Sequence, residues 1–259
     1  NEGKVPWRTA MISGHVLRPD RAKLSKSKGG GGHAPSAVIE QRSADATRYW
    51  SCSSKLGVDT MMADEAFDAG KRLTVKLWNA PKFAIQTLED YAPEAERTPA
   101  VIDRWLLARL KQTVERATAS FEECEYHAAI EAVEAFFWHD LCDNYIEIAK
   151  KRLYGDEGYD EELRRGAQYA LYQALLGTLK LMAPVMPHIT EEIHALFFEE
   201  REGVESIHVS SWPEPPAEWE DEEALDAGRV ALAVIEGMRK IKSVSKVSVA
   251  SRVGTLSVA

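Results

Sequence analysis

The sequence has no long apolar runs and little cysteine. No uninterrupted hydrophobic stretch approaches the roughly 18 residues that a membrane-spanning helix needs, so a membrane protein is not expected. The three cysteines, Cys52, Cys124 and Cys142, are odd in number and show no CxxC spacing. This usage argues against a disulfide framework or a cysteine zinc site, and it favours a reduced, cytoplasmic setting.

An excess of positive charge is also absent, because the 259 residues carry a formal charge of −9. Binding to nucleic acid depends on local patches, however, whereas net charge mainly sets solubility and steering. Basic side chains outnumber acidic ones by about two to one in residues 1–60, while acid is concentrated in residues 218–223. The charge is therefore segregated along the chain, which leaves room for an RNA-binding face.

Apolar residues recur at three- and four-residue spacing from about residue 63 to residue 201. This period predicts amphipathic helices over residues 98–121, 126–148 and 163–182, and a shorter helix over residues 187–198. Thr98 and Pro99 are typical of a helix N-cap and first turn, and Pro81 predicts a kink or break in an earlier helix. Several such helices with short links indicate an antiparallel bundle.

The last part of the chain has a different pattern. After a proline- and acid-rich linker at residues 212–223, spacing predicts one more helix near residues 231–241. Two alternating stretches follow, around Val247 and Val249 and around Val253, Leu256 and Val258, and these predict strands. We therefore expect a mainly α protein with a mixed segment over residues 1–60, a bundle over residues 61–211 and a small α+β tail over residues 212–259. The sequence starts abruptly and ends inside the last strand pattern, as expected for a piece of a longer protein.

The loop between residues 23 and 32 has the residue types that bind a triphosphate. Lys23, Lys26 and Lys28 can neutralise phosphate charge, Ser25 and Ser27 can donate hydrogen bonds, and four glycines follow. A solvated basic loop is the ordinary interpretation of a Lys/Ser-rich stretch. From average composition, the four fixed letters of KxSKS occur by chance in about one protein of this length in two hundred. The loop alone therefore only suggests a triphosphate site, and the surrounding sequence decides between the two interpretations.

The surrounding sequence resembles the class I aminoacyl-tRNA synthetases. The segment from Lys23 to Ser27 is similar to their KMSKS loop, with Leu24 in place of Met. Further matches occur in family order along the chain, at residues 11–20, 43–50, 56–60, 76–83, 103–110 and 184–193. They are shared with the valine, isoleucine and leucine group, and residues 136–147, FFWHDLCDNYIE, are most similar to the valyl-tRNA synthetases.

This resemblance implies ATP, accompanied by Mg²⁺, as the cofactor, and valine and tRNA(Val) as the other substrates. In the family the loop closes over ATP while the amino-acid carboxylate attacks the α-phosphate. Lys26 would contact the leaving pyrophosphate, Lys23 would support it, and Leu24, Ser25 and Ser27 would complete the ATP-binding loop. A monomeric, cytoplasmic enzyme with no structural metal is expected.

Two features depart from the family pattern. Gly30 stands where an asparagine usually follows the signature, which puts the role of that asparagine in doubt. The HIGH signature is absent, because His15 and His33 lie in SGHV and GGHA contexts. We therefore expect this chain alone to be unable to activate valine. An isoleucyl-tRNA synthetase fragment and a non-catalytic RNA-binding module are the alternatives.

Two groups are candidates for contact with tRNA. Phe83 could stack on an unpaired anticodon base while Lys82 meets phosphate, although Trp78 nearby is more simply interpreted as a core aromatic. Lys150, Lys151 and Arg152 could touch the tRNA backbone, or could only complement a helix dipole. A metal site at His139, Asp140, Cys142 and Asp143 is disfavoured, because no second cluster with ligand spacing completes it.

Overall fold

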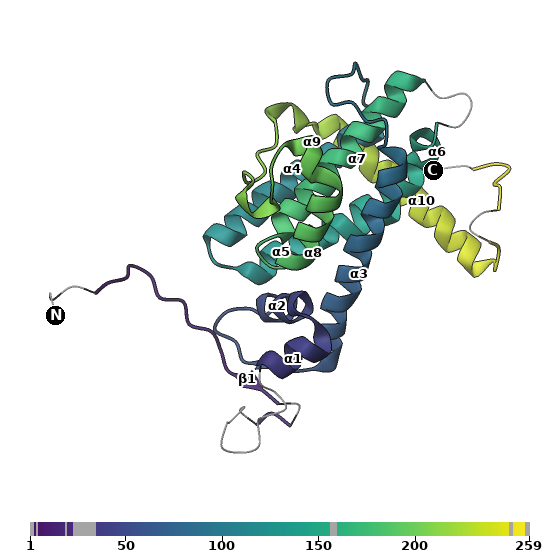
Figure 1. Cartoon of the computed structure of the whole chain (residues 1–259). Coiled ribbons are helices and arrows are strands. Elements are labelled where there is room, and N and C mark those ends of the chain that lie inside the picture. The colour runs from purple at the N-terminus through teal and green to yellow at the C-terminus, as the bar shows by residue number, and fades with distance from the viewer. Residues whose placement is uncertain are drawn as a thin grey trace. The chain divides into compact units, whose positions relative to one another are not determined.

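A computed structural model describes residues 3, 5–18, 20–22, 35–155, 160–248 and 251–256, and it is mainly α-helical, as the sequence predicted (Figure 1). The chain forms two compact units, each assembled from separate segments. The first unit comprises Asn1–Gln86, Thr113–Ala135 and Leu175–Glu214. The second unit comprises Thr87–Gln112, Phe136–Ala174 and Pro215–Ala259. Among the described residues, no helix has the length and apolarity that a membrane crossing requires.

The first unit opens with a small parallel sheet and two helices. β1 (Val16–Leu17) pairs with β2 (Thr60–Met61), and α1 (Pro35–Arg42) and α2 (Ala44–Cys52) lie between the two strands in sequence. Gly14 permits this pairing, since a Cβ there would lie 2.1 Å from the carbonyl oxygen of Val58. A side chain at this position would therefore force the two segments apart.

The helix α3 (Asp64–Thr87) continues without a break through Pro81, so the expected break is wrong. Leu73, Leu77, Ala80 and Ala84 are all buried at three- and four-residue spacing. Burial of this stripe offsets the one backbone hydrogen bond that proline removes from a helix. Tertiary packing therefore overrides the local preference at this position.

The remaining helices follow the predicted periodicity. In chain order they are α4 (Val101–Glu122), α5 (Tyr126–Ala135), the π-helical segment η3 (Phe136–Tyr145), α6 (Ile146–Leu153), α7 (Glu161–Met182), α8 (Pro187–Ile193), the π-helical segment η4 (His194–Phe198) and α9 (Glu199–Glu202). The four predicted helices are confirmed, and α7 ends before Pro184 as expected. The two π-helical segments, whose turns are wider than those of an α-helix, were not predicted.

The start of α4 differs from the prediction by two to three residues. Thr98 and Pro99 precede the helix, and Gly166 of α7 approaches them so closely that a Cβ would lie 2.5 Å from the Thr98 carbonyl oxygen. The helix N-terminus is instead capped by Asp103, whose carboxylate accepts a 2.8 Å hydrogen bond from the amide of Ala100. Thr98 and Pro99, which resemble a helix cap in sequence, therefore pack against α7 instead of capping α4.

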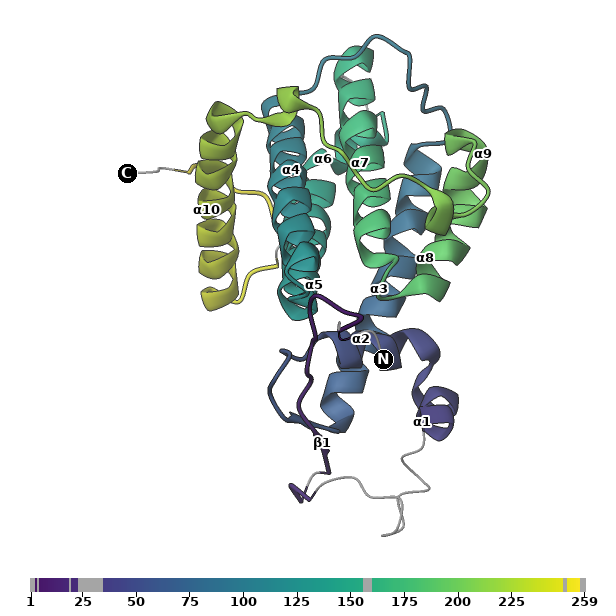
Figure 2. The ribbon, with the colours of Figure 1, turned by 90° about the vertical axis from the view of Figure 1, so that its left-hand side faces the viewer.

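The C-terminal part of the chain contains the short turns η5 (Ile207–Val209) and η6 (Ala217–Trp219) and the long helix α10 (Glu222–Val244). In the second unit, α10 runs beside the N-terminal half of α4 (Figure 2). Neither residues 245–248 nor residues 251–256 form a strand, so the described portion does not contain the expected α+β tail. Alternation of apolar residues does not make a strand unless a partner supplies the ladder of hydrogen bonds.

Candidate nucleic-acid interface

The predicted ATP-binding residues Lys23, Leu24, Ser25, Lys26 and Ser27 lie outside the described residues. The segments on either side belong to the first unit. Upstream, β1 is paired with β2, and Arg18 forms a 3.1 Å ion pair with Asp20. Downstream, α1 and α2 follow directly along the chain.

The helix α2 holds the turn between α7 and α8 with two side chains of opposite charge. Arg48 donates hydrogen bonds to the carbonyl oxygens of Pro184 (2.8 Å) and Val185 (3.0 Å), just beyond the C-terminus of α7. The carboxylate of Asp45, one turn away on α2, accepts hydrogen bonds from the amides of His188 (3.2 Å) and Ile189 (2.7 Å). Each charge therefore meets the helix end whose dipole it complements. This pattern ties the family-like segments 43–50 and 184–193 together within the first unit.

A basic surface covers the second part of α3. The acids of its first turns are Asp64, Glu65 and Asp68, and Asp64 and Asp68 form ion pairs with Arg42 at 2.5 Å and 3.3 Å. From residue 69 to residue 87 the helix carries no acid and four cations, at positions 71, 72, 76 and 82. Lys71, Arg72 and Lys82 are exposed. The sequence reasoning missed three of these four residues, although the acid-free run is visible in the sequence.

Lys82 and Phe83 lie near the end of this basic surface. The exposed Lys82 ammonium is 5.4 Å from the centre of the Trp78 ring, one helical turn earlier, in a cation–π contact. Phe83 and Trp78 are both half-buried. The segment therefore brings together a cation (Lys82), an indole ring (Trp78) and a partly exposed phenyl ring (Phe83). Cations and aromatic rings are the groups that bind single-stranded nucleic acid.

The three basic residues of α6 have different environments. Lys150 and Lys151 are exposed, and Lys150 lies 4.0 Å from Glu147. Arg152 is buried, and its guanidinium lies 2.5 Å from a carboxylate oxygen of Asp103. That oxygen also accepts a 2.8 Å hydrogen bond from the hydroxyl of Tyr145. Arg152 is thus committed to the core, and only the two lysines remain candidates for phosphate contact.

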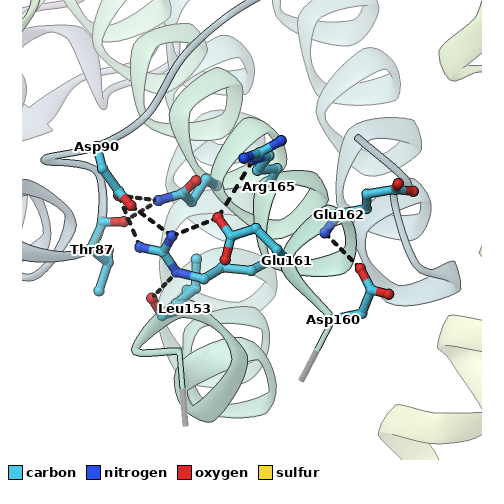
Figure 3. A network of polar contacts seen from close by, with 9 residues as sticks. Thr87, Asp90, Leu153, Asp160, Glu161, Glu162 and Arg165 are labelled. Carbon is cyan, nitrogen blue, oxygen red and sulfur yellow. Dashed lines mark hydrogen bonds and ion pairs between the residues drawn. The ribbon is translucent and has the colours of Figure 1, made fainter. Parts of the chain in front are cut away.

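A second polar network in the second unit joins the segment after α3 to α7 (Figure 3). Arg164 makes a two-pronged contact with Asp90, at 2.7 Å and 2.8 Å. The amide of Gln168 donates to Asp90 and to the carbonyl oxygen of Thr87, both at 2.8 Å. Hydrogen bonding to Arg164 lowers the pKa of Asp90 to about 2, so this carboxylate stays ionised. The network fixes a loop, and its charges are already matched with one another.

The residues weighed as a metal site have other roles. Asp140 pairs with Arg109 at 3.0 Å, and burial raises the pKa of this carboxyl while Arg109 opposes the rise. His139 lies 3.5 Å from Asp143, and both side chains are largely exposed. Within the described part of the chain, no three His, Cys, Asp or Glu side chains are grouped to hold a metal ion.

Two protein families match separate parts of the chain. Residues 103–257 match the family described as the anticodon-binding domain of tRNA ligase. Residues 1–63 match the class I tRNA synthetases of the I, L, M and V group. The whole of α3 lies in the segment between the two matches.

Curated relatives match nearly the whole chain. The valine–tRNA ligase of Ehrlichia canis is 36% identical over 253 residues, which cover 97% of this chain and 31% of that protein. The valine–tRNA ligase of Pyrococcus abyssi is 38% identical over 243 residues, which cover 93% of this chain and 27% of that protein. The chain thus spans about 30% of the length of these relatives.

Solved structures share the fold. A LeuRS from Agrobacterium radiobacter, in a ternary complex with tRNA and LeuAMS, matches with a TM-score of 0.61 and 21% identity. That match covers 81% of this chain and 24% of the other. The methionyl-tRNA synthetase of Mycobacterium tuberculosis in its free state matches with a TM-score of 0.53 and 20% identity, over 71% and 40% of the two chains. At such identities the likeness concerns the fold alone.

Proposed function

The chain belongs to the family of anticodon-binding domains of tRNA ligases, and we propose that it is the part of a cytoplasmic valine–tRNA ligase that binds the tRNA anticodon region and carries the KxSKS loop. The observation that supports this most strongly is identity of 36–38% to valine–tRNA ligases along 93–97% of the chain. Activation of valine would need ATP and a catalytic region that provides the amino-acid pocket.

The proposed reaction has two steps. The carboxylate of valine attacks the α-phosphate of ATP, with Mg²⁺ accompanying the nucleotide, and pyrophosphate leaves with the electron pair of the broken P–O bond. A hydroxyl of the tRNA end then attacks the adenylate, releasing AMP and forming the ester. Lys26 would stabilise charge on the departing pyrophosphate, and Lys23 would assist it. Ser25 and Ser27 would shape the loop around the phosphates.

The same role gives Lys26 a direct test in the full-length enzyme. Lys26→Ala should slow valyl-adenylate formation by a factor on the order of 10² or more, with little change in tRNA affinity. Valine-dependent pyrophosphate exchange measures this step. An unchanged exchange rate would remove the proposed role of Lys26.

The basic surface of α3 is the proposed contact with RNA. Its cations lie along the second part of a helix whose acids are confined to its first turns, where Arg42 pairs with Asp64 and Asp68. Phosphate contacts of this kind make affinity fall steeply as salt rises. Specificity would come from unstacked anticodon bases, because the deep major groove of A-form RNA is closed to side chains. Phe83, with Lys82 beside it, is the proposed stacking residue.

Binding of tRNA(Val) to the purified chain tests this interface, with two matched lysine variants. Lys82→Ala on α3 should weaken binding and reduce the slope of log affinity against log salt by about 1. Lys151→Ala, an exposed lysine on α6, serves as the matched comparison. If only Lys151→Ala changes the salt slope, the RNA contact belongs to α6 and the α3 assignment is wrong.

Phe83→Ala separates stacking from packing. Loss of a base–aromatic stack should weaken binding by about 1–3 kcal/mol and should have no effect on tRNA with abasic anticodon positions. A side chain that serves only the core would instead leave a cavity and lower Tm without RNA. If Phe83→Ala lowers Tm but the folded variant binds tRNA with unchanged affinity, Phe83 is a core residue and the stacking role is wrong.

A further inference from the structure

The end of α10 and the residues that follow it carry positive charge only. Residues 237–259 contain no aspartate and no glutamate, although the whole chain has a formal charge of −9. The cations in this stretch, which we call the α10 basic end, are Arg239, Lys240, Lys242, Lys246 and Arg252. Binding to nucleic acid depends on local patches of this kind rather than on net charge. The α10 basic end is therefore a candidate for contact with a polyanion.

Two of these cations are held in place by uncharged acceptors. The ammonium of Lys242 donates a 2.6 Å hydrogen bond to the carbonyl oxygen of Ser251, so the chain turns back beside the helix after α10 (Figure 2). The guanidinium of Arg239 donates to the side-chain oxygen of Asn144 and to the carbonyl oxygen of Asp143, each at 3.1 Å. These contacts position the two side chains without neutralising their charge.

The other three cations of the α10 basic end face solvent. Lys240, Lys246 and Arg252 are exposed, and none of them has an ion-pair partner within the part of the chain that the structure describes. Arg229, nearer the beginning of the same helix, instead pairs with Asp226 at 3.0 Å. Charge is therefore matched in the first half of α10 and left unmatched at its end.

Lys246 occupies a position that favours glycine. It follows the C-cap residue Ser245 and has a φ of 54°, in the left-handed region. Its amide donates to the carbonyl oxygen of Ser243 at 3.0 Å, and the amide of Val247 donates to that of Lys242 at 2.9 Å. This pair of bonds is the Schellman motif, whose left-handed residue is usually glycine because a Cβ is unfavourable there. Strained residues are concentrated at functional sites, so the lysine calls for a reason beyond folding.

We propose that the α10 basic end binds the phosphate backbone of tRNA, as a second contact in addition to the basic surface of α3. This inference rests on the proposed function, in which the chain binds tRNA. The α10 basic end lies inside residues 103–257, which match the anticodon-binding domain family. Complementing the helix dipole would account for cations in the last turn of α10, but not for Lys246 and Arg252, which lie beyond it.

The contact would carry no sequence information. Residues 237–259 contain no phenylalanine, tyrosine or tryptophan that could stack on a base. Lysine and arginine contacts to phosphate position a nucleic acid without reading its bases. The α10 basic end would therefore add affinity, while specificity would remain with the unstacked bases at α3.

Binding of tRNA(Val) to the purified chain at several salt concentrations tests the contact. A double variant with Lys240→Ala and Arg252→Ala should reduce the slope of log affinity against log salt by about 2. Its affinity in 0.1 M salt should fall on the order of tenfold. A double variant with Arg116→Ala and Arg229→Ala removes the same charge at two other exposed arginines, and it should leave the slope unchanged.

Lys246→Gly separates binding from folding, because the two properties should move in opposite directions. Glycine removes the strain of the left-handed residue, so Tm should rise, whereas loss of the ammonium should reduce the salt slope by about 1. A cation with only a structural role would not show this combination. A Lys246→Gly chain that binds tRNA(Val) as tightly as the unmodified chain, with the same salt slope, overturns the role of Lys246.

A tRNA with a substituted anticodon distinguishes this inference from the proposed function. The Lys240→Ala, Arg252→Ala variant should lose affinity by the same factor for this tRNA and for tRNA(Val), because phosphate contacts do not depend on sequence. If it loses none while Lys82→Ala still reduces the salt slope, the α10 contact is wrong and the α3 contact stands. If the unmodified chain binds no tRNA, both fail. Binding to phosphatidylglycerol vesicles that the variant abolishes, with tRNA affinity unchanged, would assign the surface to a membrane and overturn the proposal.

Discussion

Asp103 in the second unit and Asp45 in the first unit are both buried carboxylates, with 0% and 5% of their surface exposed. Asp103 meets a charged side chain, since Arg152 lies 2.5 Å away, and it also accepts hydrogen bonds from Tyr145 and the amide of Ala100. Asp45 instead accepts hydrogen bonds from two amides at the N-terminus of α8. One carboxylate is held by an ion pair and the other by a helix end.

This difference between an ion pair and a helix end predicts how much stability each region loses when one interacting side chain is removed. Burial raises the pKa of Asp103, and Arg152 and Tyr145 oppose that rise. Removing Arg152 would leave the carboxylate buried without a counter-charge, which is costly in a dry interior. Removing Asp45 would leave two backbone amides at a helix end that water can reach more easily. The first loss should therefore be larger.

Arg152→Ala should cause the largest change, a loss of about 3–5 kcal/mol in the free energy of unfolding. Urea denaturation at pH 7 measures the loss. Lys151→Ala, at the exposed neighbouring position, is the control and should change stability by less than about 0.5 kcal/mol. Equal losses of stability in the two variants would show that the Asp103–Arg152 pair contributes no more to the free energy of unfolding than an exposed lysine does.

Asp45→Ala should cost less, about 1–2 kcal/mol, which is typical for loss of a helix N-cap. The same denaturation experiment applies, with Glu40→Ala on the exposed side of α1 as control. Amide hydrogen exchange should quicken at His188 and Ile189, whose amides lose their acceptor. A loss as large as that of Arg152→Ala would contradict the distinction between ion pair and helix end.

His194, at the end of α8, sharpens the comparison because it is buried without a hydrogen-bond partner on either ring nitrogen within the described structure. Burial lowers its pKa, Glu191, Glu199 and Glu202 oppose this, and Lys180 adds to it. The unfolded chain therefore binds the proton first, and stability should fall as pH drops below about 6.5, the ordinary histidine value.

The measurement for His194 is Tm at several pH values between 7.5 and 5. His194→Phe should make the profile flatter, because it removes the titrating group, whereas His139→Gln at a largely exposed position should not. The slope from one group is at most about 1.4 kcal/mol per pH unit. An identical profile for wild type and His194→Phe would mean that the ring does not govern acid sensitivity.

Asp90→Asn should have the smallest effect, about 0.5–1 kcal/mol, because 58% of the Asp90 side chain is exposed and solvent screens its pair with Arg164. Its pKa is lowered to about 2, so the stabilisation is present above about pH 4 and is lost as pH falls toward 2. Denaturation at pH 7 in low and high salt measures it, with Glu89→Gln as control. A loss insensitive to 1 M NaCl would indicate burial rather than a surface pair.

Local periodicity was enough to find the helices, but not which residues inside them are available for function. The pattern of α7 and its end before Pro184 followed from apolar spacing and the missing proline amide. Lys150, Lys151 and Arg152 looked alike in sequence, yet only Arg152 is buried, because Asp103 lies opposite it, 49 residues away. Such a partner cannot be inferred from spacing along one helix.

The sequence by itself determined the helical character of residues 101–198, the order of the family-like motifs and the position of the KxSKS loop, since these depend on neighbouring residues. Tertiary structure decided the unbroken course of α3 through Pro81, the later start of α4 beside Gly166 and the absence of strands in the described tail. It also decided that Asp45 and Arg48 bracket the α7–α8 turn. Each of these depends on contacts between segments far apart in the chain, whose burial and hydrogen bonds outweigh local preference.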